Sequence, residues 1–482
     1  MKLQKKYGFW QILALAISAT LGSSILVSFG QVAFQAQFNP ILIIIAWILG
    51  GLLVLPEMLL LSEGATSYPE NGTSYYWIKR AKWNACSFWF GWIMVLFVSA
   101  TAVATACLAL GDILITLLKL DNEWYGKLFG IIILLVLVIM QIFLKKSSGY
   151  SQIVFVLLKG LPIVLVLVIA MVYGNTASFT DDTINKNLSQ IYLSSFLLLP
   201  ATAMTMFAYS GMEAITYVSG EVINPRKNIP WAMIISTIAI VLLYIILAIG
   251  LLTINEPQKW LGPTGKFNNV WYYAIITNRT IPSFLKYVFS VLAIFIFVGS
   301  LNSFLVYHSR LIFKMSEEKD FFAFFQKTTK RTNMPYLAIL FLVGLAIIYI
   351  LWTSLLNVTN YFIIAVSVLK FITMISLIYL RQKDVNYQPL YPKPVFIILV
   401  ILALSSSTIT FIGSILAMYY YATVTANMWE LWNCFIVFGI MLSGYHFYYL
   451  KKWLATKWNA KKERSQKRIK DNLIEKDEPF SK

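Results

Sequence analysis

The chain has 482 residues, of which 59% are apolar and only 12% are charged. An average soluble domain carries about 25% charged residues, so this composition excludes an ordinary soluble protein and predicts an integral membrane protein. The apolar residues form long continuous runs, whereas a transmembrane barrel requires alternating segments of about ten residues. The predicted fold class is therefore all-α.

The apolar runs also predict the number of membrane crossings. A hydrocarbon core about 30 Å thick needs roughly 20 apolar residues per helix. We predict twelve transmembrane helices, at residues 9–34, 38–63, 85–118, 127–145, 151–174, 193–220, 230–254, 282–314, 335–354, 357–381, 394–420 and 430–450. The first run is too long for a signal peptide and is expected to stay as the first span. Residues 1–450 would form the transmembrane domain, and residues 451–482 a basic cytoplasmic tail.

The formal net charge of +18 is best explained by membrane topology. Basic chains often bind nucleic acid. Here, however, 29 of the 39 lysines and arginines fall at the two ends and in loops on the N-terminal side of the predicted membrane, against 7 in loops on the other side. Cytoplasmic loops carry such an excess. We predict a multi-pass protein of the cell membrane that contacts lipid, has both termini in the cytoplasm and binds no nucleic acid.

The chain offers little for catalysis or for a cofactor. Its cysteines, Cys86, Cys107 and Cys434, lack metal-ligand spacing, and no nucleotide-binding glycine loop occurs. We predict no metal site, no cofactor and no ATP hydrolysis. A membrane-embedded enzyme would need a cluster of catalytic side chains near one face, and a channel would need a repeated filter segment. Both are disfavoured, so the protein is predicted not to be an enzyme.

The first apolar run is interrupted by TLGSSIL, residues 20–26. In hydrocarbon a helix breaks only where protein or water lines the break. Unwinding at Gly22, Ser23 and Ser24, with Ile25 next, would expose N–H groups at the start of the outer half-helix. The positive end of the helix dipole lies there and attracts a carboxylate.

The sixth run is interrupted by FAYSGMEA, residues 207–214. Carbonyl groups freed around Phe207, Ala208, Ser210 and Gly211 would accept hydrogen bonds from an ammonium group. Small-residue breaks at matching places in two halves of a chain indicate the midplane site of a transporter. An anion site that faces a cation site fits a zwitterion such as an amino acid. Alternatively, the glycines only allow neighbouring helices to approach closely.

Four stretches carry a resemblance to a known family: TLGSSIL (20–26), SEGATSYPENGTSYYWI (62–78), FAYSGMEAITYVSGEVINPRKNIP (207–230) and SRLIFKMSEEKDFFAFFQKTTKRTNMP (309–335). Over essentially all the predicted spans, the chain resembles the amino acid permeases of the amino acid-polyamine-organocation (APC) superfamily. It departs from the family pattern at Ser24 and Thr73, where the family usually has glycine. The change at Ser24 leaves the substrate identity open.

The resemblance implies a five-plus-five inverted-repeat (LeuT-like) fold with two extra C-terminal helices, and a site between the first, third, sixth and eighth spans. Phe207 would cover the substrate and Ser210 would line its side-chain pocket. The implied function is that of a secondary active transporter that moves amino acids across the cytoplasmic membrane by alternating access, either proton-coupled or by exchange. A polyamine or amino acid/amine antiporter is the alternative.

An ionisable residue inside a membrane span raises the free energy of insertion, so each one is expected to have a structural or functional role. Lys159 matches a lysine that in sodium-independent relatives points at the unwound first span, which implies a role in coupling. Glu213 follows the second break and would either couple protonation to gating or be a buried acid held by neighbouring hydroxyls. Glu57 and Glu63 are predicted to pair with loop or helix-end groups, and Lys370 has no predicted role.

Overall fold

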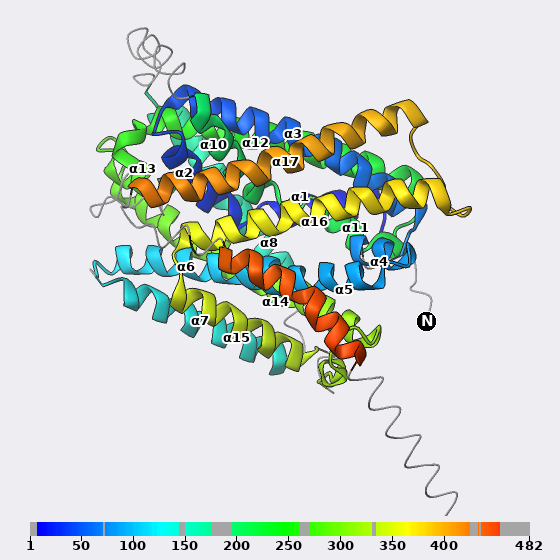
Figure 1. Cartoon of the computed structure of the whole chain (residues 1–482). Helices are drawn as coiled ribbons and strands as arrows, with labels where there is room; N and C mark the ends of the chain where they lie inside the picture. The colour runs from blue at the N-terminus through cyan, green and yellow to red at the C-terminus, as the bar shows by residue number, and fades with distance from the viewer. Residues whose placement is uncertain are drawn as a thin grey trace, which may run out of the picture.

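The computed structural model describes residues 7–70, 73–120, 122–143, 150–175, 195–260, 270–329, 334–424, 432 and 435–453. These residues form a bundle of helices that lie roughly along one direction (Figure 1). The described part of the chain contains no β-strand, only one isolated bridge between Tyr7 and Val222. The structure is therefore helical, as the composition predicts.

The helices are labelled as in Figure 1. The α-helices are α1 (Phe9–Thr20), α2 (Ser23–Gln35), α3 (Pro40–Ser67), α4 (Thr73–Arg80), α5 (Asn84–Ile93), α6 (Ala100–Leu117), α7 (Glu123–Phe143), α8 (Tyr150–Tyr173), α10 (Leu198–Tyr209), α11 (Ala214–Tyr217), α12 (Pro225–Ile254), α13 (Val270–Thr277), α14 (Ser283–Glu317), α15 (Tyr336–Trp352), α16 (Leu355–Lys383) and α17 (Lys393–Val424). A π-helical turn, η1 (Met94–Ser99), joins α5 to α6, and short 3₁₀ turns are η3 (Ser195–Leu197), η4 (Ser219–Glu221), η5 (Pro257–Trp260) and η6 (Ala323–Gln326). A last helix covers residues 435–453.

Several of these helices have the length and composition of membrane spans. Within the described residues, seven helices are long and apolar enough to cross a membrane, and the bent pair α1 and α2 makes an eighth if it is one span. Helix is found within every one of the predicted ranges, with ends that differ by a few residues. The chain is thus a multi-helix protein of membrane type. The count of twelve crossings and the inverted repeat stay predictions.

Small residues on α3 allow the helices around it to pack closely. A Cβ atom at Gly50 would lie 1.9 Å from Oγ1 of Thr205 on α10, and one at Gly51 would lie 2.4 Å from Cγ1 of Val241 on α12. Such close contacts at small residues are typical of helices in membranes. There the hydrophobic effect does not drive helices together, and association depends on van der Waals packing. The close fit brings α10 and α12 together beside α3, and α12 in turn packs against α1.

The first and last described segments lie at the same end of the bundle (Figure 1). The backbone N–H of Tyr7 donates to the carbonyl oxygen of Glu221 at 3.1 Å. Lys451, in the last helix, donates from Nζ to the carbonyl oxygen of Lys319. The side of the membrane on which this end lies stays a prediction. Of the predicted tail, residues 454–482 lie outside the described residues.

Candidate substrate site

The first predicted break is present in the structure. Helix α1 ends at Thr20, α2 begins at Ser23, and the two axes differ by 45°. Gly22 stands at the N-cap position of α2 with an extended backbone (φ −160°). Glycine has no side-chain oxygen, so it cannot cap the free N–H groups of the first turn as Ser, Thr, Asp or Asn would.

Of the N–H groups in this first turn, the structure shows an acceptor in another described helix for one. The N–H of Ser23 donates to Oγ of Ser300 on α14 at 3.0 Å, in a buried contact. No acceptor for the N–H groups of Ser24 and Ile25 is found among the described residues. Oγ of Ser23 is buried and has no hydrogen-bond partner there either. Within the described chain, the start of α2 therefore presents the N–H groups of Ser24 and Ile25 and the hydroxyl of Ser23 without hydrogen-bond partners.

The second predicted break is also present, after Tyr209 at the end of α10. Ser210 is extended (ψ 145°), and the next residue, Gly211, has φ +108°, a conformation that residues with a Cβ rarely adopt. A Cβ at Gly211 would lie 2.7 Å from the carbonyl oxygen of Ala19 and 3.1 Å from Cα of Thr20. The backbone at the second break thus rests directly on the last residues of α1, and the two breaks meet.

Glu213 has a local role at this second break. Its Oε2 accepts the N–H of Gly211 at 2.9 Å. The carboxylate therefore satisfies a backbone donor that the loss of helical winding has freed. Neither predicted role, in gating or as an acid held by hydroxyls, includes this hydrogen bond.

The freed carbonyl groups already have partial partners. The carbonyl oxygen of Phe207 accepts from Oγ of Ser210 at 2.6 Å, which ties the end of α10 to itself. The hydroxyl of Tyr244 on α12 lies 3.2 Å from the carbonyl oxygen of Thr20 and 3.4 Å from that of Ala208. The backbone N–H of Ser210 also donates to the carbonyl oxygen of Phe207, at 3.4 Å. Because a carbonyl oxygen has two lone pairs, those of Thr20 and Ala208 keep some capacity for a ligand.

Besides Ser300, two residues at the site are absent from the sequence-based predictions. Tyr244 is fully buried and touches the carbonyl groups of both breaks, and a lone phenol in the apolar run IVLLYIILAIG was the available signal. Phe362 on α16 packs edge-on against Phe207, with ring centroids 4.9 Å apart and an interplanar angle of 81°. Phe207 itself is 2% exposed. Helix α16 therefore contributes a wall beside the breaks.

Lys159 is buried on α8, which packs against α12 and α14. No hydrogen bond or ion pair joins Lys159 to another described residue, and none links it to the first break. Its expected approach to the unwound first span stays a prediction.

Two other buried charges pair across the same two helices. Nζ of Lys370 lies 2.6 Å from Oε2 of Glu57, so the prediction of a loop or helix-end partner is wrong for Glu57. For Glu63 that prediction is confirmed: Arg381, near the end of α16, lies 2.6 Å from its Oε1, and the N–H of Tyr391 donates to its Oε2 at 3.0 Å. Both pairs join α3 to α16, through long side chains.

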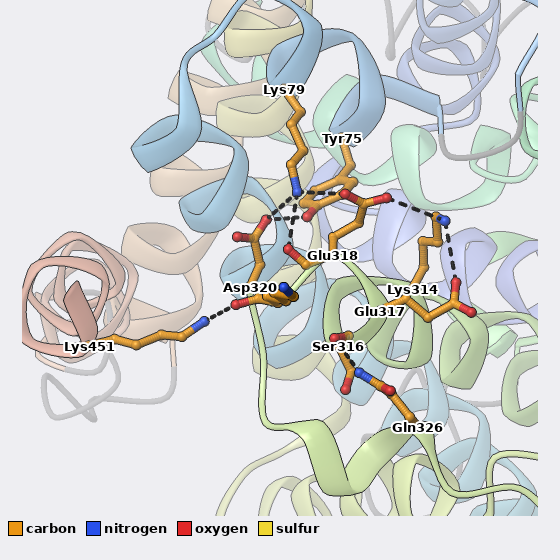
Figure 2. A network of polar contacts seen from close by, with 10 residues as sticks. Tyr75, Lys79, Lys314, Ser316, Glu317, Glu318, Asp320, Gln326 and Lys451 are labelled. Carbon is orange, nitrogen blue, oxygen red and sulfur yellow. Dashed lines mark hydrogen bonds and ion pairs between the residues drawn. The ribbon is translucent and has the colours of Figure 1, made fainter. Parts of the chain in front are cut away.

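A further polar network lies at the end of the bundle that carries α4 (Figure 2). Nζ of Lys79 lies 2.9 Å from Oε2 of Glu318 and 3.2 Å from Oδ2 of Asp320, and the hydroxyl of Tyr75 donates to the same Asp320 oxygen. Figure 2 shows Lys451 reaching the backbone of the same turn from the last helix. The hydrogen bond from Lys79 holds the pKa of Glu318 below its ordinary value. This network ties α4 to the end of α14.

Comparison with known proteins shows the family of this chain. A family model described as amino acid permease matches residues 7–442. The serine/threonine exchanger SteT of Bacillus subtilis (strain 168) is 25% identical over 408 residues, which cover 84% of this chain and 90% of the relative. The b(0,+)-type amino acid transporter 1 of Rattus norvegicus is 22% identical over 466 residues, with coverage of 95% and 90%. Solute carrier family 7 member 12 of Mus musculus is 24% identical over 403 residues, with 82% of each chain covered. With nearly its whole length matched by one family model, this chain belongs to the amino acid permease family.

Proposed function

We propose that this protein is a secondary active transporter that carries amino acids across the cytoplasmic membrane by alternating access, in exchange for a second amino acid. The observation that carries the proposal is the meeting of two helix breaks, at which Gly211 contacts the backbone of Ala19 and the N–H groups of Ser24 and Ile25 have no acceptor among the described residues. The names of the relatives, one an exchanger and one an amino acid transporter, support both parts of the proposal.

The start of α2 would hold the substrate carboxylate. A capping side chain normally accepts from the second or third N–H of a helix. In α2 these are the N–H groups of Ser24 and Ile25, which have no acceptor among the described residues, and the cap residue Gly22 has no side chain. A carboxylate of the substrate would take the place of the missing cap, with the helix dipole in its favour.

The end of α10 would hold the substrate ammonium group. The carbonyl oxygens of Phe207, Ala208 and Ser210 would accept its hydrogen bonds: Ala208 through a lone pair that Tyr244 leaves unused, and Phe207 in exchange for one of its two bonds from Ser210. The ring of Phe207 would cover the substrate, supported by Phe362. Such a site selects the zwitterionic head of an amino acid and excludes a diamine, which has no carboxylate for α2.

Coupling would depend on Lys159 and Glu213. An ammonium group on Lys159 would supply the positive charge that sodium supplies in sodium-coupled relatives, so no sodium gradient would be required. Glu213 would link the state of the site to the shape of the break, because its carboxylate holds the N–H of Gly211. The wider fold that we propose has twelve crossings with an inverted repeat and both termini in the cytoplasm.

The test is transport by the full chain in proteoliposomes. Uptake of labelled serine, threonine, leucine, arginine and putrescine would be measured with and without unlabelled amino acid inside, and with and without a pH gradient. We expect uptake of at least one amino acid, stimulated by internal amino acid and insensitive to the pH gradient. Uptake driven by the pH gradient into empty vesicles would replace exchange with proton symport.

Absence of any amino acid uptake, with uptake of putrescine alone, would overturn the proposed substrate class. The Lys159→Ala variant tests coupling in the same vesicles. We expect it to lose most of its exchange activity. If both uptake and its response to pH matched the unaltered chain, Lys159 would have no part in coupling.

A further inference from the structure

Ser300 differs from three other serines of α14, which lie on either side of it in the middle of the helix. The hydroxyls of Ser290, Ser303 and Ser309 donate to carbonyl oxygens of their own helix, Lys286 at 2.8 Å, Gly299 at 2.9 Å and Val306 at 3.2 Å. Such back-bonding is the usual way for a serine to satisfy itself inside a helix. Oγ of Ser300 instead accepts the N–H of Ser23, a residue 277 positions away in the chain.

The hydrogen bond to Ser300 falls on one particular amide of α2. Ser23 is the first residue of the helix, and Ser24 and Ile25 are the second and third. Because a cap acceptor uses the second or third N–H, the bond from Ser23 to Ser300 does not compete for the amides that a carboxylate would use. It satisfies the first N–H of the helix proper and holds the peptide plane that joins Gly22 to Ser23.

Gly22 and Ser300 fit each other closely. A Cβ atom at Gly22 would lie 3.0 Å from Oγ of Ser300 but 4.0 Å from its Cβ. A side chain at the cap position would therefore be in tight contact with the hydroxyl, which would have to shift by a few tenths of an ångström. Both Ser23 and Ser300 are 1% exposed, so neither group can exchange this bond for one to bulk water.

We propose that Ser300 is a positioning residue for substrate binding: it orients the start of α2 so that the amides of Ser24 and Ile25 face the substrate carboxylate. This inference rests on the proposed function. It places a determinant of substrate affinity on α14, outside both broken helices. Loss of the Ser300 hydroxyl leaves the first amide of α2 buried without an acceptor and frees the cap peptide to rotate.

The first experiment compares Ser300→Ala with Ser303→Ala in proteoliposomes, since the Ser303 hydroxyl bonds only within its own helix. We expect Ser300→Ala to raise KM for the transported amino acid about five- to tenfold, the equivalent of one hydrogen bond, with kcat within about twofold. Ser303→Ala is expected to leave both unchanged. Ser300→Thr, which keeps the hydroxyl, should restore most of the affinity.

The second experiment is a double-mutant cycle with Gly22→Ala. In the unaltered background the new methyl group presses on the Ser300 hydroxyl, which must shift by a few tenths of an ångström, so the bond to Ser23 should weaken and KM should rise, by no more than in Ser300→Ala. In the Ser300→Ala background the same methyl group meets only a Cβ at ordinary contact distance, so it should add little. Residues that share one contact give such non-additive effects.

The outcomes separate this inference from the function on which it rests. Equal KM values for Ser300→Ala and the unaltered chain, with transport intact, would overturn the role of Ser300 and leave the transporter standing. Fully additive effects in the cycle would do the same. A parallel fall in kcat and in the thermal stability of Ser300→Ala, with KM unchanged, would show a structural role and also overturn the inference. If the unaltered chain transports no amino acid, the proposed function itself fails.

Discussion

Gly211 and Ala19 are in backbone contact, since a Cβ at Gly211 would lie 2.7 Å from the carbonyl oxygen of Ala19. The two residues are almost two hundred positions apart, and each lies at the loss of winding in its own helix. The contact explains why the small residue in the second break is a glycine. It also makes the geometry of one break depend on that of the other.

Gly211→Ala should therefore disrupt both breaks. The positive φ costs roughly 1–3 kcal/mol for a residue with a Cβ, and the methyl group would press on backbone atoms of α1 that cannot rotate away. We expect the melting temperature of the purified protein to fall by at least about 3 °C and uptake to be lost. The control is Gly344→Ala on α15, where a Cβ would meet nothing within 4 Å. A Gly211→Ala protein as stable as this control would contradict the contact.

Tyr244→Phe tests the phenol that lies between the two breaks. Removal of its hydroxyl leaves the carbonyl oxygens of Thr20 and Ala208 without their donor in a buried place. Buried carbonyl groups without a partner cost about 1–3 kcal/mol, and their new freedom should disturb the ammonium side of the site. We expect kcat/KM for uptake to fall about tenfold or more.

The matched control for this variant is Tyr209→Phe. The hydroxyl of Tyr209 donates to the carbonyl oxygen of Trp47 at 3.0 Å, a buried contact to α3 rather than to a carbonyl group of either broken helix. Loss of that bond should lower stability by a similar amount and leave KM nearly unchanged. Equal kinetic effects in the two variants would mean that Tyr244 acts through general packing.

The sequence predicts the local features of this protein well. Long apolar runs predict where helices lie, and Gly22 and Ser210–Gly211 predict the breaks, because both depend on residues close together in the chain. Thr73, which stands where the family pattern has glycine, adopts a left-handed φ of +51°, so the turn keeps the glycine conformation without the glycine. Here the family pattern indicates the backbone geometry better than the residue does.

Contacts between distant helices could not be predicted in the same way. Tyr244, Ser300 and Phe362 each lie in an apolar run that does not indicate which residues they contact, and they join the site only because α12, α14 and α16 pack around the breaks. Lys370 likewise has a role only because it forms an ion pair with Glu57, more than three hundred positions away in the chain. The arrangement of the helices around one another depends on the packing of the whole bundle. It cannot be predicted from the residue pattern within one apolar run.

Lys370→Met should be more harmful than the loss of the whole ion pair. The change leaves the Glu57 carboxylate, whose side chain is 6% exposed, in the bundle without its cation. Removal of one partner of a buried pair costs about 3–5 kcal/mol, whereas replacement of both partners is often tolerated. We expect Lys370→Met to have a lower melting temperature than the Glu57→Gln/Lys370→Met double variant. A double variant less stable than either single variant would show that the pair is not the source of the effect.

The stability of the folded protein is expected to depend on pH through Asp384. The hydroxyl of Tyr68 donates to its Oδ2 at 2.7 Å and Nε of Arg80 at 2.9 Å, which lowers the pKa of Asp384 to about 2 from an ordinary value of 3.8. Because the folded pKa is the lower one, the stabilisation is complete above the ordinary value and is lost as the pH falls through about 2. The melting temperatures of the unaltered chain and Asp384→Asn should therefore differ by a constant amount from about pH 8 to about pH 5. Below about pH 4 this difference should shrink, and a difference that widened on acidification would show that Asp384 is not held ionised by Tyr68 and Arg80.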